Sequence, residues 1–249
     1  MERLTETRAP ITWRIARVVD VRPETSTAKT IVLDVPQWPG HLAGQHVDVR
    51  LTAEDGYQAQ RSYSIASPPE DAHVSLTVER IDSGEVSTYL ADELRVGDAM
   101  ELRGPIGGYF TWQVEDGGPL VLFAGGSGLV PLMAMLRHRI AAGSDVPVKL
   151  LVSARTHADV LYRDELGRQA DVAVDVRYTL TRETEPDWTG WTRRVDAEML
   201  REMGVGRIDD GALYVCGPTA FVEYVAELLV GLGHDPHRVK TERFGPTGG

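Results

Sequence analysis

The spacing of apolar and polar residues divides the chain into two halves with different periods. Up to about Trp112, short segments alternate apolar and polar residues and are separated by clusters of Pro, Gly, Asp and Ser, which predicts β-strands joined by turns. The expected strands are 15–21, 29–35, 46–51, 61–66, 74–80 and 99–103, and only 86–94 has a helical pattern. Six short strands with one helix predict a small antiparallel barrel, because closure removes exposed sheet edges.

Beyond Gly117 and Gly118 the pattern changes to strands alternating with helices. The expected strands are 120–124, 148–153, 172–180, 212–216 and 239–244, and the expected helices are 129–142, 158–169, 196–203 and 221–232. This alternation predicts a parallel sheet covered on both faces. We therefore expect two domains, an antiparallel six-stranded β-barrel in residues 1–115 and an α/β parallel-sheet domain in residues 116–249, with the boundary near 115–118.

Composition narrows the class of protein. The 249 residues are 42% hydrophobic and 25% charged, as in ordinary globular proteins, and the net charge of −11 lacks the basic excess expected of a nucleic-acid or anionic-membrane binder. The single cysteine, Cys216, permits no intrachain disulfide and no four-cysteine metal centre, and we expect no metal site. Residues 1–8 include charged side chains at positions where a secretory signal would be apolar, so we expect a cytoplasmic protein.

An uncharged stretch at 117–136 has the length of a membrane span, but its composition indicates strand, turn and helix instead. The turn is Gly125-Gly126-Ser127-Gly128, and glycines between a strand and a helix allow phosphates to approach backbone amides. A tight turn without a ligand is the alternative. Pro131 stands where the third glycine of G-x-G-x-x-G would be, so the ordinary dehydrogenase fingerprint is incomplete.

The ends of the next strands bear on which nicotinamide nucleotide is bound. An acidic residue after the second strand would bind the ribose hydroxyls of NAD, but the segment here is Ser153-Ala154-Arg155-Thr156. Further arginines follow the third strand, at Arg182, Arg193 and Arg194. Guanidinium groups suit a phosphate, which favours NADP over NAD, whereas solvated surface arginines are the alternative.

The first half holds two more segments that could carry chemistry. In Arg61-Ser62-Tyr63-Ser64, strand alternation places Arg61 and Tyr63 on one side and the two serines on the other. A cation, an aromatic plate and a hydroxyl suit a ligand, although the segment is also an ordinary β pattern. Gly84 and Ser87 begin the only helix of this half, either as a second phosphate cradle or as a plain helix cap.

Five motifs in this order resemble the ferredoxin–NADP reductase superfamily of FAD-dependent oxidoreductases over residues 11–244. They are Arg61 to Ser64, Gly84 to Leu90, Gly104-Pro105-Ile106-Gly107, Gly125 to Pro131, and Cys216-Gly217-Pro218. The resemblance implies an FAD-binding barrel followed by a nicotinamide-nucleotide domain, with hydride passing between nicotinamide and flavin where the domains meet.

The resemblance also implies roles for individual residues. In the barrel, Arg61 would contact the flavin pyrophosphate beside Ser62, Tyr63 would stack on the isoalloxazine and Ser64 would lie near N5; Val78, Glu79 and Arg80 would line the ribityl chain, and Gly84, Val86, Ser87 and Thr88 the pyrophosphate. In the second domain, Gly126, Ser127 and Gly128 would face the nicotinamide side of NADP, Cys216 and Gly217 would border the reaction centre, and Arg155, Arg182 and Arg194 would hold the 2′-phosphate, with Arg193 as a substitute. Near the C-terminus, Glu242 would relay protons and Phe244 would either cover the flavin or pack in the core.

These roles predict an NADPH-dependent FAD reductase that delivers single electrons to a separate carrier such as a ferredoxin-type protein, because a flavin accepts two electrons and releases them singly. Some members of the superfamily continue into an iron–sulfur domain with several cysteines; this sequence has no such cluster, so we expect the carrier to be a separate molecule. The alternatives are a reductase component that serves an oxygenase or another redox partner with NADH, a diaphorase, and a non-catalytic NADP-responsive flavoprotein module.

Overall fold

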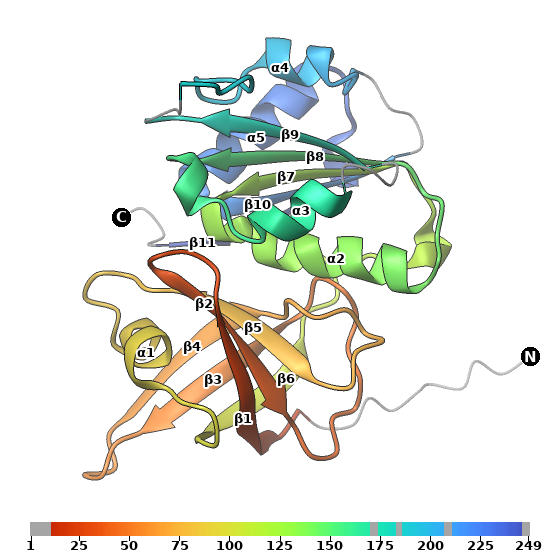
Figure 1. The fold of residues 1–249 in the computed structure, drawn as a ribbon. Helices are drawn as coiled ribbons and strands as arrows, with labels where there is room; N and C mark the ends of the chain where they lie inside the picture. Colours follow the sequence, from red (N-terminus) through yellow and green to blue (C-terminus); the bar gives the residue numbers. More distant parts are fainter. Residues whose placement is uncertain (1–10, 170–173, 183–185, 207–210, 246–249) are drawn as a thin grey trace, which may run out of the picture.

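A computed structural model describes residues 11–169, 174–182, 186–206 and 211–245. They form a β-barrel and an α/β layer packed against it, with the parallel sheet lying across one end of the barrel (Figure 1). No helix in the part of the chain that is described is long and apolar enough to cross a membrane.

The barrel contains six antiparallel strands, as the sequence predicts. They are β1 (Trp13–Pro23), β2 (Ala28–Asp34), β3 (His46–Thr52), β4 (Gln58–Ser64), β5 (Val74–Glu79) and β6 (Ala99–Ile106), in the order β4-β3-β6-β1-β2-β5. The outer strands meet just beyond β4, where Ile65 bridges Leu76 and the Ala66 amide donates to the Ser75 carbonyl at 2.7 Å. This contact closes the sheet at one end.

The helix predicted at 86–94 is shorter and less regular than expected. It consists of one α-helical turn, α1 (Glu85–Thr88), followed by a π-helical turn, η1 (Tyr89–Glu93). Leu90 and Leu94 are buried in the barrel core. The Leu94 amide donates to the Tyr89 carbonyl at 3.0 Å, the i to i−5 bond of a π-helical turn.

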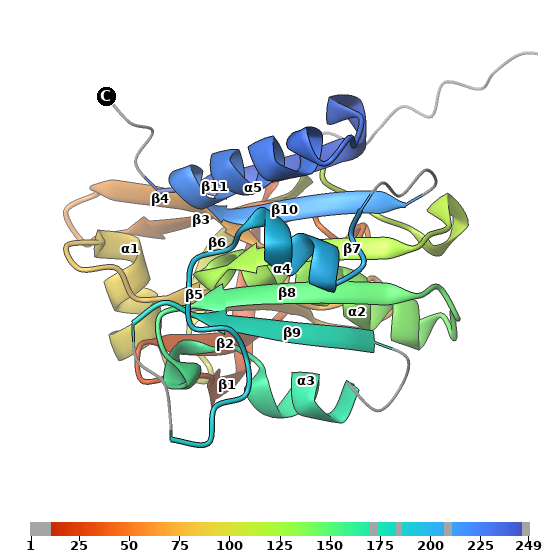
Figure 2. The same cartoon turned by 90° about the horizontal axis from the view of Figure 1, so that it is seen from above.

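The second sheet is fully parallel and has the predicted strands. They are β7 (Leu120–Gly125), β8 (Val148–Ala154), β9 (Val174–Leu180), β10 (Ala212–Pro218) and β11 (Val239–Phe244), in the order β11-β10-β7-β8-β9 (Figure 2). Helices α2 (Leu129–Ala141) and α3 (Arg163–Gln169) lie on the face toward the barrel, and α4 (Ala197–Glu202) and α5 (Thr219–Gly231) lie on the other face (Figure 1). Both faces are therefore covered, as expected for a parallel sheet.

The helix expected at 158–169 begins only at Arg163, so its predicted start is wrong. Residues His157–Asp159 form a 3-10 turn, in which the Asp159 carboxylate accepts from the Thr156 amide at 3.1 Å. Tyr162 then has a φ of 52°, which a continuing right-handed helix does not permit. The predicted start of the following strand, at 172, lies outside the described residues.

The two domains share a core and a buried hydrogen-bond network. Ala28, Ala43 and Ala66 of the barrel belong to the same apolar cluster as α2. The network, which we call the interdomain network, comprises Glu24, Thr30, Thr77, Arg137 and Tyr162. The Tyr162 hydroxyl donates to Thr77, whose Oγ1 lies 2.7 Å from that of Thr30; Thr30 in turn donates to Glu24 at 2.7 Å.

Three further contacts complete the interdomain network. Arg137 on α2 donates to the Ala66 carbonyl at 2.7 Å, and its guanidinium carbon lies 4.6 Å from the centre of the Tyr162 ring. The Tyr162 amide donates to Glu24 at 3.3 Å. Arg137 and Tyr162 of the α/β domain are thus joined to the barrel by both polar and apolar contacts.

Candidate functional site

Strand β4 presents the arginine and tyrosine of the Arg61–Ser64 motif on one face. Tyr63 and Arg61 pair with the buried Val47 and Val49 of β3. Tyr63 is half-buried against the barrel core, and burial raises the pKa of its hydroxyl to about 12. Arg61 is exposed, and no carboxylate of the described residues lies within ion-pair distance of it. An unpaired cation and an aromatic ring therefore share this face.

The Ser62 side chain points to the other face. Its hydroxyl donates to Asp48 at 2.6 Å, and Asp48 is paired with Arg103 at 2.6 Å. The serine hydroxyl and the arginine hold the pKa of Asp48 below its usual value, although desolvation opposes them. The structure therefore does not bring the Ser62 side chain to Arg61 and Tyr63.

The end of β5 and the segment that follows it carry the other residues expected to bind the flavin. Val78 is buried, Glu79 is exposed, and Arg80 is exposed and lies 3.4 Å from Asp92. Gly84 precedes α1, and a Cβ atom there would lie 2.4 Å from the Ser87 hydroxyl oxygen.

The Ser87 hydroxyl closes the turn before α1. It donates to the Gly84 carbonyl and accepts from the Ile81 amide, each at 3.2 Å. Val86 is buried and Thr88 is half-buried, and no side chain caps α1. The first amides of α1 are therefore left without a side-chain partner.

The glycine-rich turn of the second domain combines close packing with one open position. A Cβ atom on Gly128 would lie 2.1 Å from the Cys216 carbonyl oxygen, and one on Gly125 would lie 2.7 Å from the Phe221 ring. Gly126 has a φ of 53°, is exposed and has no atom within 4 Å of its Cβ position. Gly125 and Gly128 therefore serve packing, whereas Gly126 and the half-buried Ser127 form the accessible part of the turn.

Three residues predicted to act at the reaction centre come together at the meeting of the two domains. Cys216 of β10 pairs with Glu242 of β11, and the His46 Nδ1 atom of β3 lies 3.8 Å from the Glu242 Oε1 atom. His46 is the direct strand partner of Ser64. Neighbouring contacts thus link Ser64 to His46, His46 to Glu242, and Glu242 to Cys216. Sequence reasoning missed His46 because its position depends on a contact between distant strands.

Burial determines the protonation of this group. It raises the pKa of Glu242 to about 7, raises the pKa of the Cys216 thiol well above its usual value, and lowers the pKa of His46. The Glu242 Oε2 atom is buried without a hydrogen-bond partner among the described residues. A carboxyl group whose pKa is about 7 and whose second oxygen has no hydrogen-bond partner can accept or release a proton near neutral pH.

Gly217 and Phe244 lie at the edge of this group. Gly217 pairs with Arg243, and Phe244, which is 38% exposed, pairs with Pro218 at the ends of β11 and β10. The Phe244 side chain is thus partly exposed at the end of β11 and is not buried in the core.

Two of the predicted phosphate ligands lie side by side. Arg155 follows β8 and Arg182 follows β9, and the Arg182 amide donates to the Arg155 carbonyl at 3.0 Å. Both are exposed, with no carboxylate of the described residues within ion-pair distance. This adjacency creates a local positive charge on an otherwise acidic protein.

The other two arginines differ from each other. Arg193 pairs with Asp196 at 2.6 Å and with Glu198 at 3.3 Å, so the expectation that it could substitute as a phosphate ligand is not supported. Arg194 is exposed. The same Asp196 carboxylate also caps α4, where it accepts from the Met199 amide at 2.9 Å. Arg193 is therefore held beside the start of that helix.

The site residues fit a flavin and a nicotinamide nucleotide. On the barrel, uncapped amides and an unpaired arginine suit a pyrophosphate, and a half-buried tyrosine suits an aromatic ring. On the sheet, the open turn at Gly126 and the free arginines lie at the carboxyl ends of parallel strands, where nucleotides bind in such folds.

Comparison with known proteins agrees with this division of the site. Residues 17–111 match the family model of the oxidoreductase FAD-binding domain, and residues 122–227 match that of the oxidoreductase NAD-binding domain. A ferredoxin–NADP reductase B from Sorangium cellulosum is 34% identical over 239 residues, covering 92% of this chain and 96% of that protein.

Two other proteins extend the comparison. A glycine betaine monooxygenase reductase subunit from Pseudomonas aeruginosa is 31% identical over 247 residues; the match covers 95% of this chain but 66% of that longer protein. The crystal structure of the FAD/NAD-binding domain of a nitric oxide dioxygenase from Vibrio cholerae superposes with a TM-score of 0.82 at 26% identity, covering 94% of this chain and 99% of that domain. The chain therefore belongs to the ferredoxin–NADP reductase superfamily of FAD-dependent oxidoreductases.

Proposed function

We propose that this protein passes electrons between NADPH and a separate one-electron carrier of the ferredoxin type. The observation that carries the proposal is the convergence of Ser64 and His46 from the barrel with Glu242 and Cys216 from the parallel sheet. On this view residues 1–115 bind FAD, residues 116–249 bind the nicotinamide nucleotide, and the enzyme acts in the cytoplasm. FAD supplies the chemistry, because it accepts two electrons together and releases them one at a time.

The side chains hold and orient the two ligands. Arg61 binds the flavin pyrophosphate and Tyr63 stacks on the isoalloxazine, while the open turn at Gly126 and Ser127 admits the nicotinamide nucleotide. Positioning is the main task, because hydride transfer requires two rings in van der Waals contact rather than a strong acid or base.

Glu242 holds the proton that is released when NADPH is oxidised. Oxidation of one NADPH provides two electrons and one proton as hydride, and two one-electron carriers remove only the electrons. One proton must therefore reach solvent in each cycle. The half-buried Glu242 carboxyl, with a pKa of about 7, is suited to hold that proton.

The preference for NADPH is attributed to Arg155 and Arg182. Replacing both with alanine should raise the KM for NADPH at least about tenfold and leave the KM for NADH unchanged, because only NADPH carries a 2′-phosphate. Arg177→Ala is the matched control, since this exposed arginine on β9 is already paired with Asp175. Equal effects of the double substitution on both nucleotides would remove the 2′-phosphate assignment.

A reductase component that serves an oxygenase with NADH is the second candidate. The observation that favours it is the 31% identity to the Pseudomonas aeruginosa reductase subunit of a monooxygenase. It predicts reduction by NADH at least as fast as by NADPH.

One experiment distinguishes these candidates. The visible spectrum of the purified protein is recorded, followed by anaerobic titration with each nucleotide and then by addition of a ferredoxin. Faster bleaching by NADPH and electron delivery to ferredoxin support the main proposal. Faster bleaching by NADH favours the oxygenase component, bleaching without delivery to any acceptor favours a regulatory module, and failure to bind FAD excludes all three.

A further inference from the structure

One face of β3 carries three charged or titratable side chains. His46, Asp48 and Arg50 are alternate residues of this strand, so their side chains lie on the same face. His46 is the first residue of β3, and Ser64 of β4 lies opposite it. At this end of the strand His46 contacts the other domain through Glu242 of β11.

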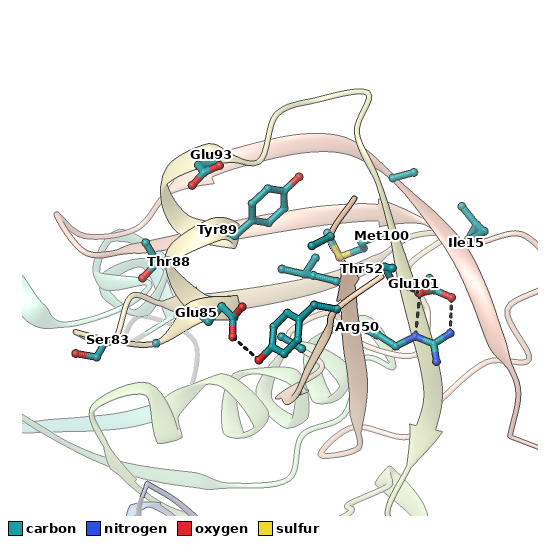
Figure 3. Close-up of a pocket in the computed structure, with 16 residues that line it drawn as sticks. Ile15, Arg50, Thr52, Ser83, Glu85, Thr88, Tyr89, Glu93, Met100 and Glu101 are labelled. Carbon is teal, nitrogen blue, oxygen red and sulfur yellow. Dashed lines mark hydrogen bonds and ion pairs between the residues drawn. The ribbon is translucent and has the colours of Figure 1, made fainter. Parts of the chain in front are cut away.

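The other two members of this row are paired within the barrel. Asp48 accepts from Ser62 and pairs with Arg103, each at 2.6 Å, and these partners hold the pKa of Asp48 below its usual value. Arg50 donates to Glu101 at 2.8 Å (Figure 3). An arginine stays protonated and Asp48 stays ionised near neutral pH, so neither of them exchanges protons there.

The Arg50 end of the row borders a cavity of about 760 Å³ beside α1, with Tyr57 and Glu85 in its walls (Figure 3). The Tyr57 hydroxyl donates to the Glu85 carboxylate at 3.1 Å, and Arg50 and Glu101 line the same cavity as a pair. The ionic groups nearest Arg50 are therefore engaged with each other. His46, at the opposite end of the row, is the member that can exchange a proton near neutral pH.

The His46 ring has access to solvent. Its side chain is 26% exposed, and neither ring nitrogen makes a hydrogen bond to a residue that the structure describes. Gly107 is exposed and lies beside the ring, where a Cβ atom would be 3.5 Å from the His46 Nδ1 atom. The absence of a side chain at Gly107 therefore leaves room for water next to the imidazole.

The Gly104–Gly107 motif places that glycine. His46 pairs with Ile106 of β6, and the register of the two strands shifts directly after this pair. The shift is a bulge, which lets β6 turn past the end of β3. Gly107 follows with a φ of 100°, a conformation that glycine adopts without strain. The motif thus shapes the surroundings of His46, a role that the proposed binding of flavin and nucleotide does not explain.

Glu242 has one enclosed oxygen and one that faces His46. Its Oε2 atom is buried without a hydrogen-bond partner among the described residues, and its Oε1 atom lies 3.8 Å from the His46 Nδ1 atom. This distance is longer than a hydrogen bond, so a proton crosses it through one bridging water or after a small side-chain rotation. The neighbouring Cys216 thiol stays protonated, because burial raises its pKa, and does not compete for the proton.

We propose that His46 relays the proton of Glu242 to solvent. The proposal rests on the proposed function, because it takes Glu242 to hold the proton that NADPH oxidation releases. In the relay the O–H bond at Glu242 Oε1 breaks and an N–H bond forms at His46 Nδ1. The proton on His46 Nε2 then leaves to water, and exchange with water restores the starting tautomer. No electron moves in this step.

The pKa values support this direction. Burial raises the pKa of Glu242 to about 7 and lowers the pKa of His46 below its usual 6.5, although Asp48 opposes the second shift. Imidazolium is therefore the stronger acid of the two. It holds the proton briefly and gives it up to water, as a relay between an enclosed carboxyl and solvent requires.

The first test measures flavin reduction and proton release separately in the FAD-loaded enzyme. Stopped-flow mixing with NADPH follows flavin bleaching, and mixing of the reduced enzyme with ferricyanide and a pH indicator follows proton release. Ferricyanide accepts single electrons and no proton. His46→Gln should slow proton release at least about tenfold and change the rate of flavin reduction less than about twofold. His73→Gln, at an exposed histidine of the barrel, is the matched control and should change neither rate.

Two further measurements separate a relay from a structural role. Imidazole added to the solution should restore at least about half of the wild-type rate of proton release to His46→Ala, because it replaces the missing group, and should leave wild type unchanged. In the flavin-free protein, the NMR signal of the His46 ring should show a second step near pH 7, which reports the ionisation of Glu242, besides its own titration. Glu242→Gln should remove that step.

The outcomes distinguish the relay from the proposed function. Wild-type proton release in His46→Gln, equal slowing of reduction and proton release, no rescue by imidazole, or a His46 signal without the step near pH 7 overturns the relay while the reductase function stands. A wild-type protein whose flavin neither nucleotide reduces overturns the proposed function itself.

Discussion

At the residue scale, burial acts on the two titratable side chains that meet between the domains. The Glu242 carboxyl and the His46 imidazole both lose solvation, which disfavours their charged forms. The pKa of Glu242 rises to about 7, and that of His46 falls despite the nearby Asp48 carboxylate. Near neutral pH the imidazole is therefore mainly uncharged and the carboxyl only partly ionised, so their 3.8 Å contact is not mainly an ion pair.

Replacing Glu242 should change how stability depends on pH. Because the folded pKa lies above the usual 4.5, the folded state holds a proton that the unfolded state has lost, and stability present below about pH 4.5 is lost as pH rises through about 7. Relative to Glu242→Gln, which cannot ionise, wild type should lose up to about 3 kcal/mol of unfolding free energy between pH 5 and pH 8. Urea unfolding at both pH values measures this.

The matched control for this prediction is Glu223→Gln, on the exposed side of α5. It makes the same chemical change without burial and should show the wild-type pH dependence. If Glu242→Gln retained that dependence too, the carboxyl would not be protonated in the folded protein near neutral pH.

At the element scale, α2 and β10 are held together by contact between backbones. The turn η3 (Gly126–Gly128) touches the end of β10 so closely that Gly128 has no room for a side chain, since a Cβ would lie 2.1 Å from the Cys216 carbonyl oxygen. This contact brings the glycine-rich turn next to Cys216 and Glu242. The turn proposed to admit the nicotinamide nucleotide and the Glu242 carboxyl proposed to hold a proton thus lie close together.

Gly128→Ala should push η3 away from β10. We expect a loss of about 1–3 kcal/mol in the free energy of unfolding, the usual cost of overpacking, together with weaker nucleotide binding. Gly167→Ala is the control: this helical glycine of α3 has no atom within 4 Å of its Cβ position, so the substitution should be neutral or stabilising. Urea denaturation of both variants checks this, and a fully stable Gly128→Ala protein would contradict the close contact.

At the scale of the whole molecule, the interdomain network fixes how the two domains face each other. Tyr162 belongs to the segment between β8 and α3, and its hydroxyl reaches Thr77 of β5, one residue before the strand end proposed to line the flavin. Its φ of 52° is unusual for a tyrosine, and the surrounding contacts hold it there. The segment between β8 and α3, which begins at Arg155, is thus tied directly to the strand whose end is proposed to line the flavin.

Tyr162→Phe should loosen this arrangement without emptying the core. Loss of one buried hydrogen bond should lower the free energy of unfolding by about 1 kcal/mol. The rate of flavin reduction at saturating NADPH should fall, while the NADPH dissociation constant should stay unchanged, because the nucleotide site itself is intact.

Stopped-flow reduction and urea unfolding measure these two effects, with Tyr178→Phe as control. Tyr178 is a half-buried tyrosine of β9, and its hydroxyl makes no hydrogen bond to the residues that the structure describes. An unchanged reduction rate in Tyr162→Phe would mean that the shared apolar core alone orients the domains.

Local patterns in the chain were sufficient for the architecture. Period-two alternation identified the six barrel strands, and the change to strand and helix identified the parallel sheet. The Arg61–Ser64 motif and the glycine-rich turn could be located because their chemistry depends on neighbours in sequence. The strand period alone placed Arg61 and Tyr63 on one side.

Only the tertiary structure decided the features that depend on contacts between distant segments. The contact between His46 and Glu242 joins residues almost 200 positions apart in the sequence. The ion pairs of Arg193 depend on which carboxylates fold beside it. The cavity at Tyr57 forms only when α1 packs beside the barrel strands. Burial, which sets the pKa of Glu242, is a property of the packed molecule. Sequence periodicity records the face on which a residue lies, whereas proximity across the fold is determined only when the domains pack.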